Sequence, residues 1–120
     1  AEIKDMFLHK GGLIAYAGTN DAREVNRRID AGDEKAAELM RAMAYQNAKE
    51  IGAYAAVLSF KLDGVILTGG LANWTRFVEE VRRRVGFLGR IFVYPGENEM
   101  QALGEGATLA VAGLIDVKKY

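Results

Sequence analysis

The feature of this sequence that most constrains its fold is a long helical segment between Asp33 and Leu58. Apolar side chains recur in it at spacings of three and four residues, and no proline occurs before residue 90, which is the pattern of a helix with one buried stripe. The predicted stripe is Met40, Ala44, Asn47, Ile51, Tyr54 and Leu58. Such a helix is about 40 Å long, whereas a compact globule of 120 residues has a radius of gyration of about 13–14 Å. We therefore expect the helix to extend beyond its own domain and to pack on another domain or subunit, unless Gly52 kinks it.

Downstream of this helix, the sequence predicts an alternation of strands and helices. The β-branched run Val65–Thr68 is typical of a strand buried on both faces, and Arg90–Tyr94 predicts a second strand. A helix from Trp74 to about Phe87 is expected between them, and a last helix from Glu97 to about Leu114. The first of these helices would bury Phe77, Val78, Val81 and Val85. The order strand, helix, strand, helix indicates an α/β fold with parallel strands.

Upstream of the long helix, three short elements are expected. Ile3–Lys10 predicts a short helix, and the apolar run Leu13–Ala17 predicts a strand that ends at Gly18. A helix from Ala22 to about Asp30 follows, with Thr19, Asn20 or Asp21 as its N-cap. There is no internal repeat and no low-complexity segment. The whole chain, residues 1–120, is predicted to form a single domain.

Composition excludes several classes of function. Lys+Arg and Asp+Glu both count 16, so no excess of positive charge favours binding to nucleic acid or to an anionic membrane. Cysteine is absent, and His9 and Ser59 are the only histidine and serine, which excludes a thiol nucleophile, a zinc cluster or a serine-histidine triad within this chain. No apolar stretch is long enough for a membrane span, and the first residues lack the pattern of a signal peptide. These features predict a soluble, cytoplasmic protein.

Two loops stand where predicted elements meet and could bind a ligand. Gly69 and Gly70 follow the strand Val65–Thr68 directly, and paired glycines let the backbone approach a ligand at the carboxyl end of a sheet. The alternative is a tight turn without a ligand. The segment Gly18–Arg23 ends one predicted element and begins the next, so its side chains could face the same edge, or it could serve only as a helix cap beside a solvated arginine. The sequence lacks the glycine-rich patterns of a Walker loop and of a dinucleotide fold.

A third loop, after the strand Arg90–Tyr94, carries two carboxylates. Glu97 and Glu99 follow Pro95-Gly96 and could hold a divalent cation such as magnesium, which prefers oxygen ligands. The alternative is that these residues only stabilise the first turn of a helix. Trp74, which follows shortly after Gly69 and Gly70, could belong to the core or could stack on a base.

Taken together, these loops resemble the C-terminal part of the butyrate kinases, in the superfamily of acetate and sugar kinases, Hsc70 and actin. The resemblance covers nearly the whole chain and is carried jointly by several segments. They are Gly11–Val25, Gly32–Ala36, Ala44–Gln46, Lys49–Ala53, Leu67–Ala72 and Val93–Met100. The resemblance implies an α/β fold of the ribonuclease-H-like type found in actin-like ATPases, as a C-terminal subdomain with a partial mixed sheet packed by helices.

The resemblance also implies a function and the residues that serve it. Butyrate kinases are phosphotransferases that move phosphate between ATP and butyrate or another short-chain carboxylate, giving an acyl phosphate and ADP, with Mg²⁺. By this resemblance Gly69, Gly70 and Leu71 form an adenosine motif, and Asn20, Asp21 and Arg23 reach the nucleotide from the other side. Asn73 is included among the nucleotide-binding residues, and either Glu97 or Glu99 matches the residue associated with the metal.

Members of this family are longer than this chain, and their phosphate-binding loops and catalytic residues lie upstream of the matching part. We therefore expect that the parent protein is the kinase, that this chain alone is inactive, and that no catalytic residue lies within it. The alternative is a structural or assembly unit that forms a homo-oligomer without binding nucleotide. The overlong helix favours assembly with further copies or with a missing N-terminal domain, whereas the convergence of the loops favours the nucleotide site.

Overall fold

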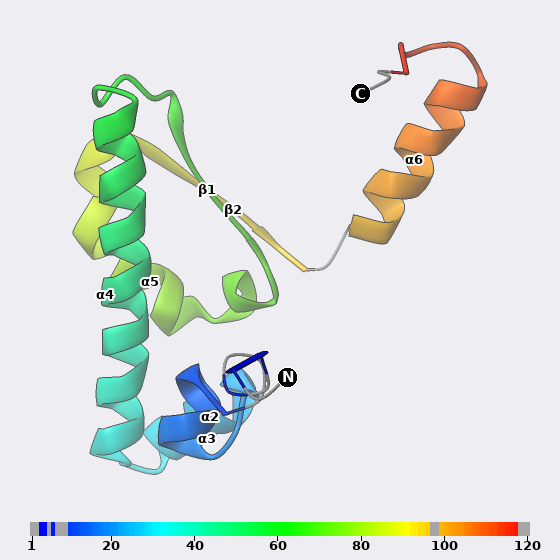
Figure 1. Ribbon diagram of the computed structural model, residues 1–120. Helices are drawn as coiled ribbons and strands as arrows, with labels where there is room; N and C mark the ends of the chain where they lie inside the picture. The colour runs from blue at the N-terminus through cyan, green and yellow to red at the C-terminus, as the bar shows by residue number, and fades with distance from the viewer. Residues whose placement is uncertain (1–2, 5, 7–9, 97–98, 118–120) are drawn as a thin grey trace.

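The computed structural model describes residues 3–4, 6, 10–96 and 99–117, and its helices and strands follow one another in the order shown in Figure 1. The elements are α2 (Gly12–Ala17), α3 (Ala22–Asp30), α4 (Glu34–Val57), β1 (Gly64–Gly69), the 3₁₀ helix η1 (Gly70–Asn73), α5 (Thr75–Val85), the 3₁₀ helix η2 (Gly86–Leu88), β2 (Arg90–Pro95) and α6 (Glu99–Val111). Of the short helix predicted over 3–10, residues 3, 4 and 6 are helical, and residues 5 and 7–9 lie outside the described part.

The long helix α4 confirms the strongest prediction from the sequence. The Asp33 side chain accepts a hydrogen bond from the Ala36 N–H at 3.0 Å and begins the helix, and the helix continues through Gly52 to Val57. The predicted buried stripe is only partly right, because Asn47, Tyr54 and Leu58 are exposed. The buried residues of α4 are Ala36, Met40, Ala44, Ala48 and Ala55. Most of these buried residues are alanines, and their small side chains allow α3 and α5 to approach α4 closely.

The strands confirm the predicted parallel arrangement. β1 and β2 pair in parallel, with Val65 opposite Ile91 and Leu67 opposite Val93, and α5 connects them. The prediction that β1 is buried on both faces is wrong: Val65 is 9% exposed, but its neighbour Ile66 is 65% exposed. The helices cover one face of this two-stranded sheet, and in the described residues the other face has no covering layer.

The segment predicted as a strand over Leu13–Ala17 is a helix, α2. Gly18 ends it in the left-handed conformation, with φ 72°, and donates its N–H to the Ile14 carbonyl at 2.9 Å. A short apolar run fits a strand or a helix equally well by pattern alone. In the described residues the sheet consists of β1 and β2, so no strand lies beside this segment, and its backbone hydrogen bonds form within a helix instead.

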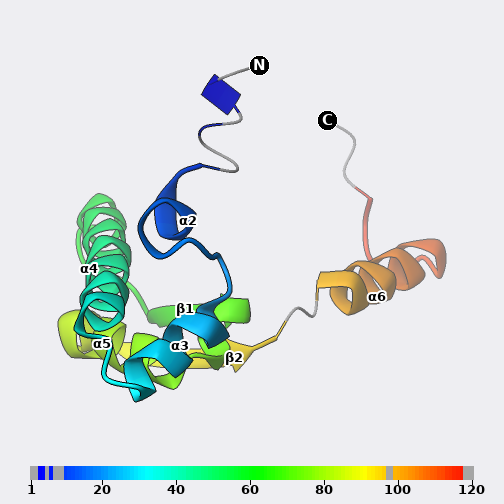
Figure 2. The ribbon, with the colours of Figure 1, turned by 90° about the horizontal axis from the view of Figure 1, so that it is seen from below.

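The core lies where α3, α4 and α5 meet, and α6 lies apart from it. Val25 and Val81 are fully buried, Trp74 is 7% exposed and stacks with Phe77 at a ring-centroid distance of 6.1 Å. Trp74 therefore belongs to the core, one of the two roles that the sequence left open. Figures 1 and 2 both show α6 separated from the other helices beyond the end of β2. No helix in the described residues is long and apolar enough to cross a membrane.

Candidate functional site

A hollow of about 1020 Å³ joins two loops that lie far apart in the sequence. It is lined by Asn20, Asp21, Ala22, Arg23, Gly70, Leu71 and Asn73. One wall is the beginning of α3 and the other is η1, which follows β1. Every residue predicted to bind nucleotide lines this hollow, except Gly69, which immediately precedes the lining residue Gly70 in the chain. The structure thus brings together two loops that the sequence could only suggest were neighbours.

The first wall is organised by local hydrogen bonds. Thr19 Oγ1 accepts from the Asp21 N–H at 3.1 Å, and Asp21 Oδ1 accepts from the Arg23 N–H at 2.9 Å. Asp21 is therefore the N-cap of α3. Arg23 also returns to Asp21 through its side chain, with Nε at 3.0 Å from Oδ1 and Nη2 at 3.1 Å from Oδ2. A two-pronged pair of this kind holds the guanidinium in a defined orientation at the rim of the hollow.

This pairing sets the charges of the first wall. The hydrogen bond from the Arg23 side chain, and next the bond from its backbone N–H, lower the pKa of Asp21 below its ordinary value. The same carboxylate raises the pKa of Arg23. Both groups are therefore charged at neutral pH. The carboxylate offers acceptor oxygens to hydroxyl or amine groups of a ligand, and the guanidinium offers donors beside them.

The second wall begins at Gly69, whose backbone has φ 80° and ψ −172°. This conformation is accessible to glycine and strained for residues with a side chain. No atom lies within 4 Å of the place where a Cβ would stand, so the backbone here is open to an approaching group. The chain then turns through η1, where the Asn73 side chain donates to the Gly70 carbonyl at 3.3 Å and the Trp74 N–H donates to the Leu71 carbonyl at 3.0 Å. Leu71 is 38% exposed and supplies an apolar surface to the hollow.

The two carboxylates predicted to hold a metal ion follow β2 in the chain. Glu99 is the first residue of α6, and Glu97 lies outside the described residues. Within the described ranges, no group of three or more histidine, cysteine, aspartate or glutamate side chains could hold a metal ion. The metal site therefore stays a prediction from the resemblance.

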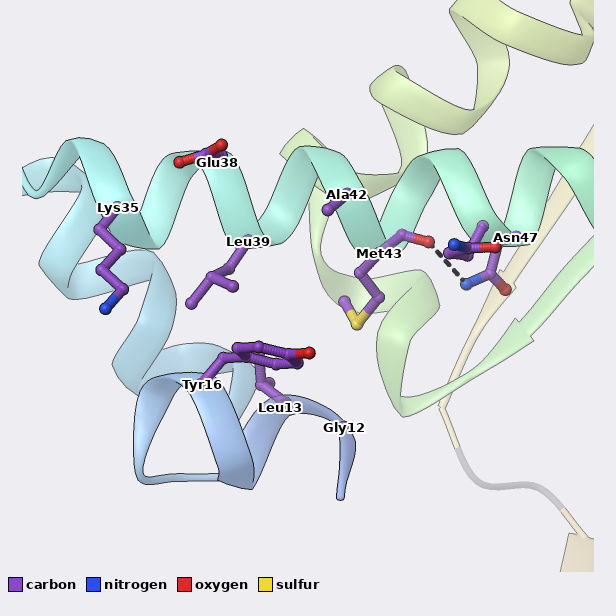
Figure 3. A pocket seen from close by; sticks show the side chains of 10 residues that line it. Gly12, Leu13, Tyr16, Lys35, Glu38, Leu39, Ala42, Met43 and Asn47 are labelled. Atoms are coloured by element: carbon purple, nitrogen blue, oxygen red, sulfur yellow. Dashed lines mark hydrogen bonds between the residues drawn. The ribbon is translucent and has the colours of Figure 1, made fainter. Parts of the chain in front are cut away.

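The sequence did not predict a second hollow, which lies between α2 and α4 (Figure 3). This groove of about 580 Å³ is lined mainly by apolar groups, with Leu13 and Tyr16 of α2 facing Leu39 and Met43 of α4. Asn47 lies toward one end and donates its side-chain N–H to the Met43 carbonyl at 3.0 Å. The sequence did not reveal this groove because residues 13–17 were expected to form a strand. The only sequence signal for the groove was the recurrence of apolar residues at helical spacing in α4.

Comparison with known proteins assigns the family. Residues 1–112 match the acetokinase family. A probable butyrate kinase 2 from Caldanaerobacter subterraneus subsp. tengcongensis is 50% identical over 119 residues, which is 99% of this chain and 34% of that protein. Probable butyrate kinases from Listeria welshimeri and Listeria monocytogenes are 43% and 42% identical over the same share of each chain.

The match covers only part of each relative. The chain spans about a third of the length of these relatives, 34% in each case. The match to the family runs from residue 1 to residue 112, just after the end of α6, and it includes both walls of the hollow. On this finding the chain belongs to the acetokinase family.

Proposed function

We propose that this chain is the adenosine-binding segment of a butyrate kinase, an enzyme that transfers phosphate between ATP and butyrate or another short-chain carboxylate. The observation that carries the proposal is the hollow between α3 and η1, because both of its walls lie inside the segment matched to the family. The names of the relatives supply the reaction class. The chain spans about a third of those relatives, so the activity belongs to the parent protein, and the chain alone would be inactive.

The residues of the hollow suit an adenosine group. Leu71 offers an apolar surface for the base, and the exposed backbone at Gly70 allows the sugar to approach closely. Asn20 and Asn73 carry amide groups that hydrogen-bond to base or ribose edges, and Asp21 accepts from ribose hydroxyls. Gly69 contributes by forming the turn that begins this wall, in a backbone conformation that is strained for other residues. Phosphate groups carry negative charge, which the Arg23 guanidinium opposes at the rim.

Magnesium is part of the proposed reaction, because Mg²⁺ neutralises charge on the transferring phosphate when it is bound. Glu99, or Glu97, is proposed as the metal-associated carboxylate on the resemblance alone. Oxygen ligands of this kind suit the ion. In the parent protein, the other two thirds of the sequence would bind the phosphate groups and the carboxylate substrate next to this hollow.

We further propose that the fold is a C-terminal subdomain of the actin-like ATPase type and that residues 1–120 belong to one domain of the parent protein. The parallel unit β1–α5–β2, with a ligand hollow at the carboxyl end of β1, supports this proposal. A two-stranded sheet with one uncovered face also fits a subdomain whose sheet is extended by other parts of the parent.

The direct test is calorimetric titration of the chain with ATP and ADP in the presence of Mg²⁺. We expect saturable binding, even if weak: a dissociation constant near millimolar corresponds to about −4 kcal/mol. Gly70→Val should abolish this binding, because a branched side chain blocks the approach of the ligand to the backbone. Gly104→Val, the same change in α6 and away from the hollow, is the matched control and should bind as the unmodified chain does.

A second pair of variants tests the other wall. Arg23→Gln removes the guanidinium at the rim, and Arg27→Gln makes the same change one turn later on α3, outside the residues that line the hollow. Weaker binding of ATP in Arg23→Gln only would support the assignment. Retained affinity in both Gly70→Val and Arg23→Gln would contradict it.

The alternative is an assembly unit without nucleotide binding, and a specific observation favours it. Beyond the contact with α5, the end of α4 exposes large apolar side chains. These are Tyr54, Val57, Leu58 and, just after the helix, Phe60. Light scattering on the same sample distinguishes the two proposals: a folded homo-oligomer that binds neither ATP nor ADP would support the assembly role.

A further inference from the structure

The two walls of the hollow belong to helices that are separated by the whole of α4 and β1 in the sequence. The first wall continues into α3, and the second continues through η1 into α5. A ligand held between them binds more tightly when their spacing is fixed before it arrives. The contacts between α3 and α5 therefore bear on what the hollow can bind.

A partly buried hydrogen bond connects α3 to the beginning of α5 close to the residues that line the hollow. The indole Nε1 of Trp74 donates to Oδ1 of Asn26 at 2.8 Å. Asn26 lies one helical turn after Ala22, which lines the hollow, and Trp74 directly follows Asn73, which lines the other wall. The bond thus connects the two elements that form the walls, within one helical turn of the residues that line the hollow.

A second pair of side chains reinforces this connection one turn further along α3. Arg76 Nη2 lies 2.7 Å from Oδ1 of Asp30, and Arg76 Nη1 lies 3.4 Å from Oδ1 of Asn26. Asn26 Nδ2 in turn donates to Oδ2 of Asp30 at 3.2 Å. The four side chains form a closed polar network, with two members on α3 and two at the beginning of α5.

The network has a property that a simple surface ion pair lacks. Trp74 is only 7% exposed and its ring packs on Phe77 in the core, so the direction of its N–H is fixed by the packing of the ring. A donor held in this way forms a good hydrogen bond only when its acceptor lies in one position, whereas an exposed ion pair forms in many arrangements. The indole N–H therefore favours one position of the Asn26 acceptor, and with it one position of α3 relative to α5.

We propose that Asn26 and Trp74 are positioning residues for nucleotide binding, which set the spacing of the two walls through this hydrogen bond, with Arg76 and Asp30 as support. The inference rests on the proposed function of the hollow. It adds that affinity for the adenosine group depends on side chains that do not line the hollow. Neither residue contacts the ligand, so any effect on binding passes through the loops that they hold.

The first experiment measures the spacing without any ligand. The sequence contains no cysteine, so Arg27→Cys and Thr75→Cys give the only attachment sites for spin labels, one on α3 and one on α5, and neither lines the hollow. Pulsed electron paramagnetic resonance on this labelled chain should give one narrow distance distribution. Adding Asn26→Leu or Trp74→Phe should shift or broaden it, because the shared hydrogen bond is lost.

The second experiment measures affinity for ADP by calorimetry in the unlabelled chain. Asn26→Leu and Trp74→Phe should each weaken binding by about tenfold. The double variant should be no weaker than Asn26→Leu alone, because Asn26→Leu already removes the bond that Trp74→Phe removes. Asn47→Leu is the matched control, because Asn47 bonds only within its own helix α4. It should change neither the label distance nor the affinity.

A rescue variant separates positioning from stability. Asn26→Asp combined with Asp30→Asn exchanges the two groups and keeps an acceptor for Trp74 and Arg76, with an amide donor on the next turn. It should restore both the narrow distribution and the affinity. Far-UV circular dichroism establishes that each variant is folded. If Trp74→Phe fails to fold, the test stands on Asn26→Leu and the exchange variant.

Each outcome decides the proposal. An unchanged label distance in Asn26→Leu overturns it, whatever happens to binding. A changed distance with unchanged ADP affinity also overturns it, because the bond would then only stabilise the fold. If the unmodified chain binds no ADP, the proposed function fails and the positioning role with it, but a changed label distance would still establish that the bond sets the spacing of α3 and α5. Changed distance and weakened affinity, both restored by the exchange, support the proposal.

Discussion

Helices α5 and α6 each follow one strand of the same sheet, yet one is buried and the other is not. In α5 the apolar side chains Phe77, Val78, Val81 and Val85 are all buried. In α6 Met100 is 80% exposed, Leu103 is 67% exposed and Val111 is 91% exposed. Figure 1 shows the consequence, since α5 packs behind α4 while α6 lies beyond the end of β2.

Connectivity explains this difference better than apolar content does. A helix between two parallel strands must return across the sheet, so α5 is brought onto its face and against α4. In the described residues no strand follows β2, so α6 is not required to return across the sheet. It therefore does not lie against an apolar face that it could cover. The comparison teaches that a helix with many apolar residues is buried only when the chain brings a second apolar face to it.

The largest effect should come from emptying the core at α5 and making the matching change in α6. Phe77→Ala removes a buried ring that packs on Trp74 and should lower the free energy of unfolding by about 3–5 kcal/mol. Leu103→Ala removes a side chain that is 67% exposed and should change it by less than about 0.5 kcal/mol. Urea unfolding followed by circular dichroism measures both. Equal losses would show that α6 also packs on the core.

A smaller effect is expected at Gly64, where β1 leaves no room for a side chain against β2. A Cβ at Gly64 would stand 2.6 Å from the Arg90 carbonyl oxygen and 2.8 Å from the Phe92 ring. Gly64→Ala should therefore push the strands apart and cost about 1–3 kcal/mol of unfolding free energy. The urea midpoint of this variant should fall, and an unchanged midpoint would mean that the sheet contributes little to the stability of α3, α4 and α5.

Two glycine replacements in helices sharpen the contrast between the packed helices and α6. Gly52 in α4 and Gly104 in α6 both have no atom within 4 Å of the place for a Cβ, so alanine at either should favour its helix by about 0.5–1 kcal/mol. Only Gly52→Ala should raise the temperature of cooperative unfolding, because only α4 unfolds together with the core. Gly104→Ala should raise the helical signal alone. A higher unfolding temperature in Gly104→Ala would contradict the separation of α6.

The smallest effect concerns pH and the N-cap of α3. The pKa of Asp21 is lowered in the folded chain, chiefly by the hydrogen bond from the Arg23 side chain. A carboxyl group whose pKa is lower when folded stabilises the fold above its unfolded pKa, and this stabilisation is lost as the pH falls through the folded pKa. Asp21→Asn keeps a good cap but has no charge. Its unfolding temperature should lie below that of the unmodified chain at pH 6, and the gap should close below about pH 4.

A second carboxylate serves as the internal reference for that titration. The hydrogen bond from Arg83, and then the charges of Arg83, Arg84 and Arg41, lower the pKa of Glu80 in α5. Its contribution falls with acid in both proteins equally, so it cancels in the difference between them. A gap that persists unchanged at pH 3 would show that Asp21 contributes through its shape and not through its charge.

Much of the fold and part of the site could be predicted from the sequence, and the misses have physical causes. The N-cap residues Asp21 and Asp33 and the stripe of α5 are local signals, so α3, α4 and α5 were found at nearly their observed bounds. The segment Leu13–Ala17 was wrongly predicted as a strand, because only the presence or absence of a neighbouring strand decides that case. The exposed Tyr54 and Leu58 were assigned to a buried stripe, because periodicity does not reveal where the covering helix ends.

The sequence by itself determined helices α3, α4 and α5 and the family of this protein, since caps, glycine turns and side-chain periodicity act over a few residues and the matched segments are read directly. It also identified the two loops that could bind a nucleotide. Only the tertiary structure decided that Asn20–Arg23 and Gly70–Asn73 line one hollow, and that Trp74 reaches Asn26 beneath it. The physical reason is that such contacts depend on how α3 and α5 both pack against α4, which no window of neighbouring residues encodes.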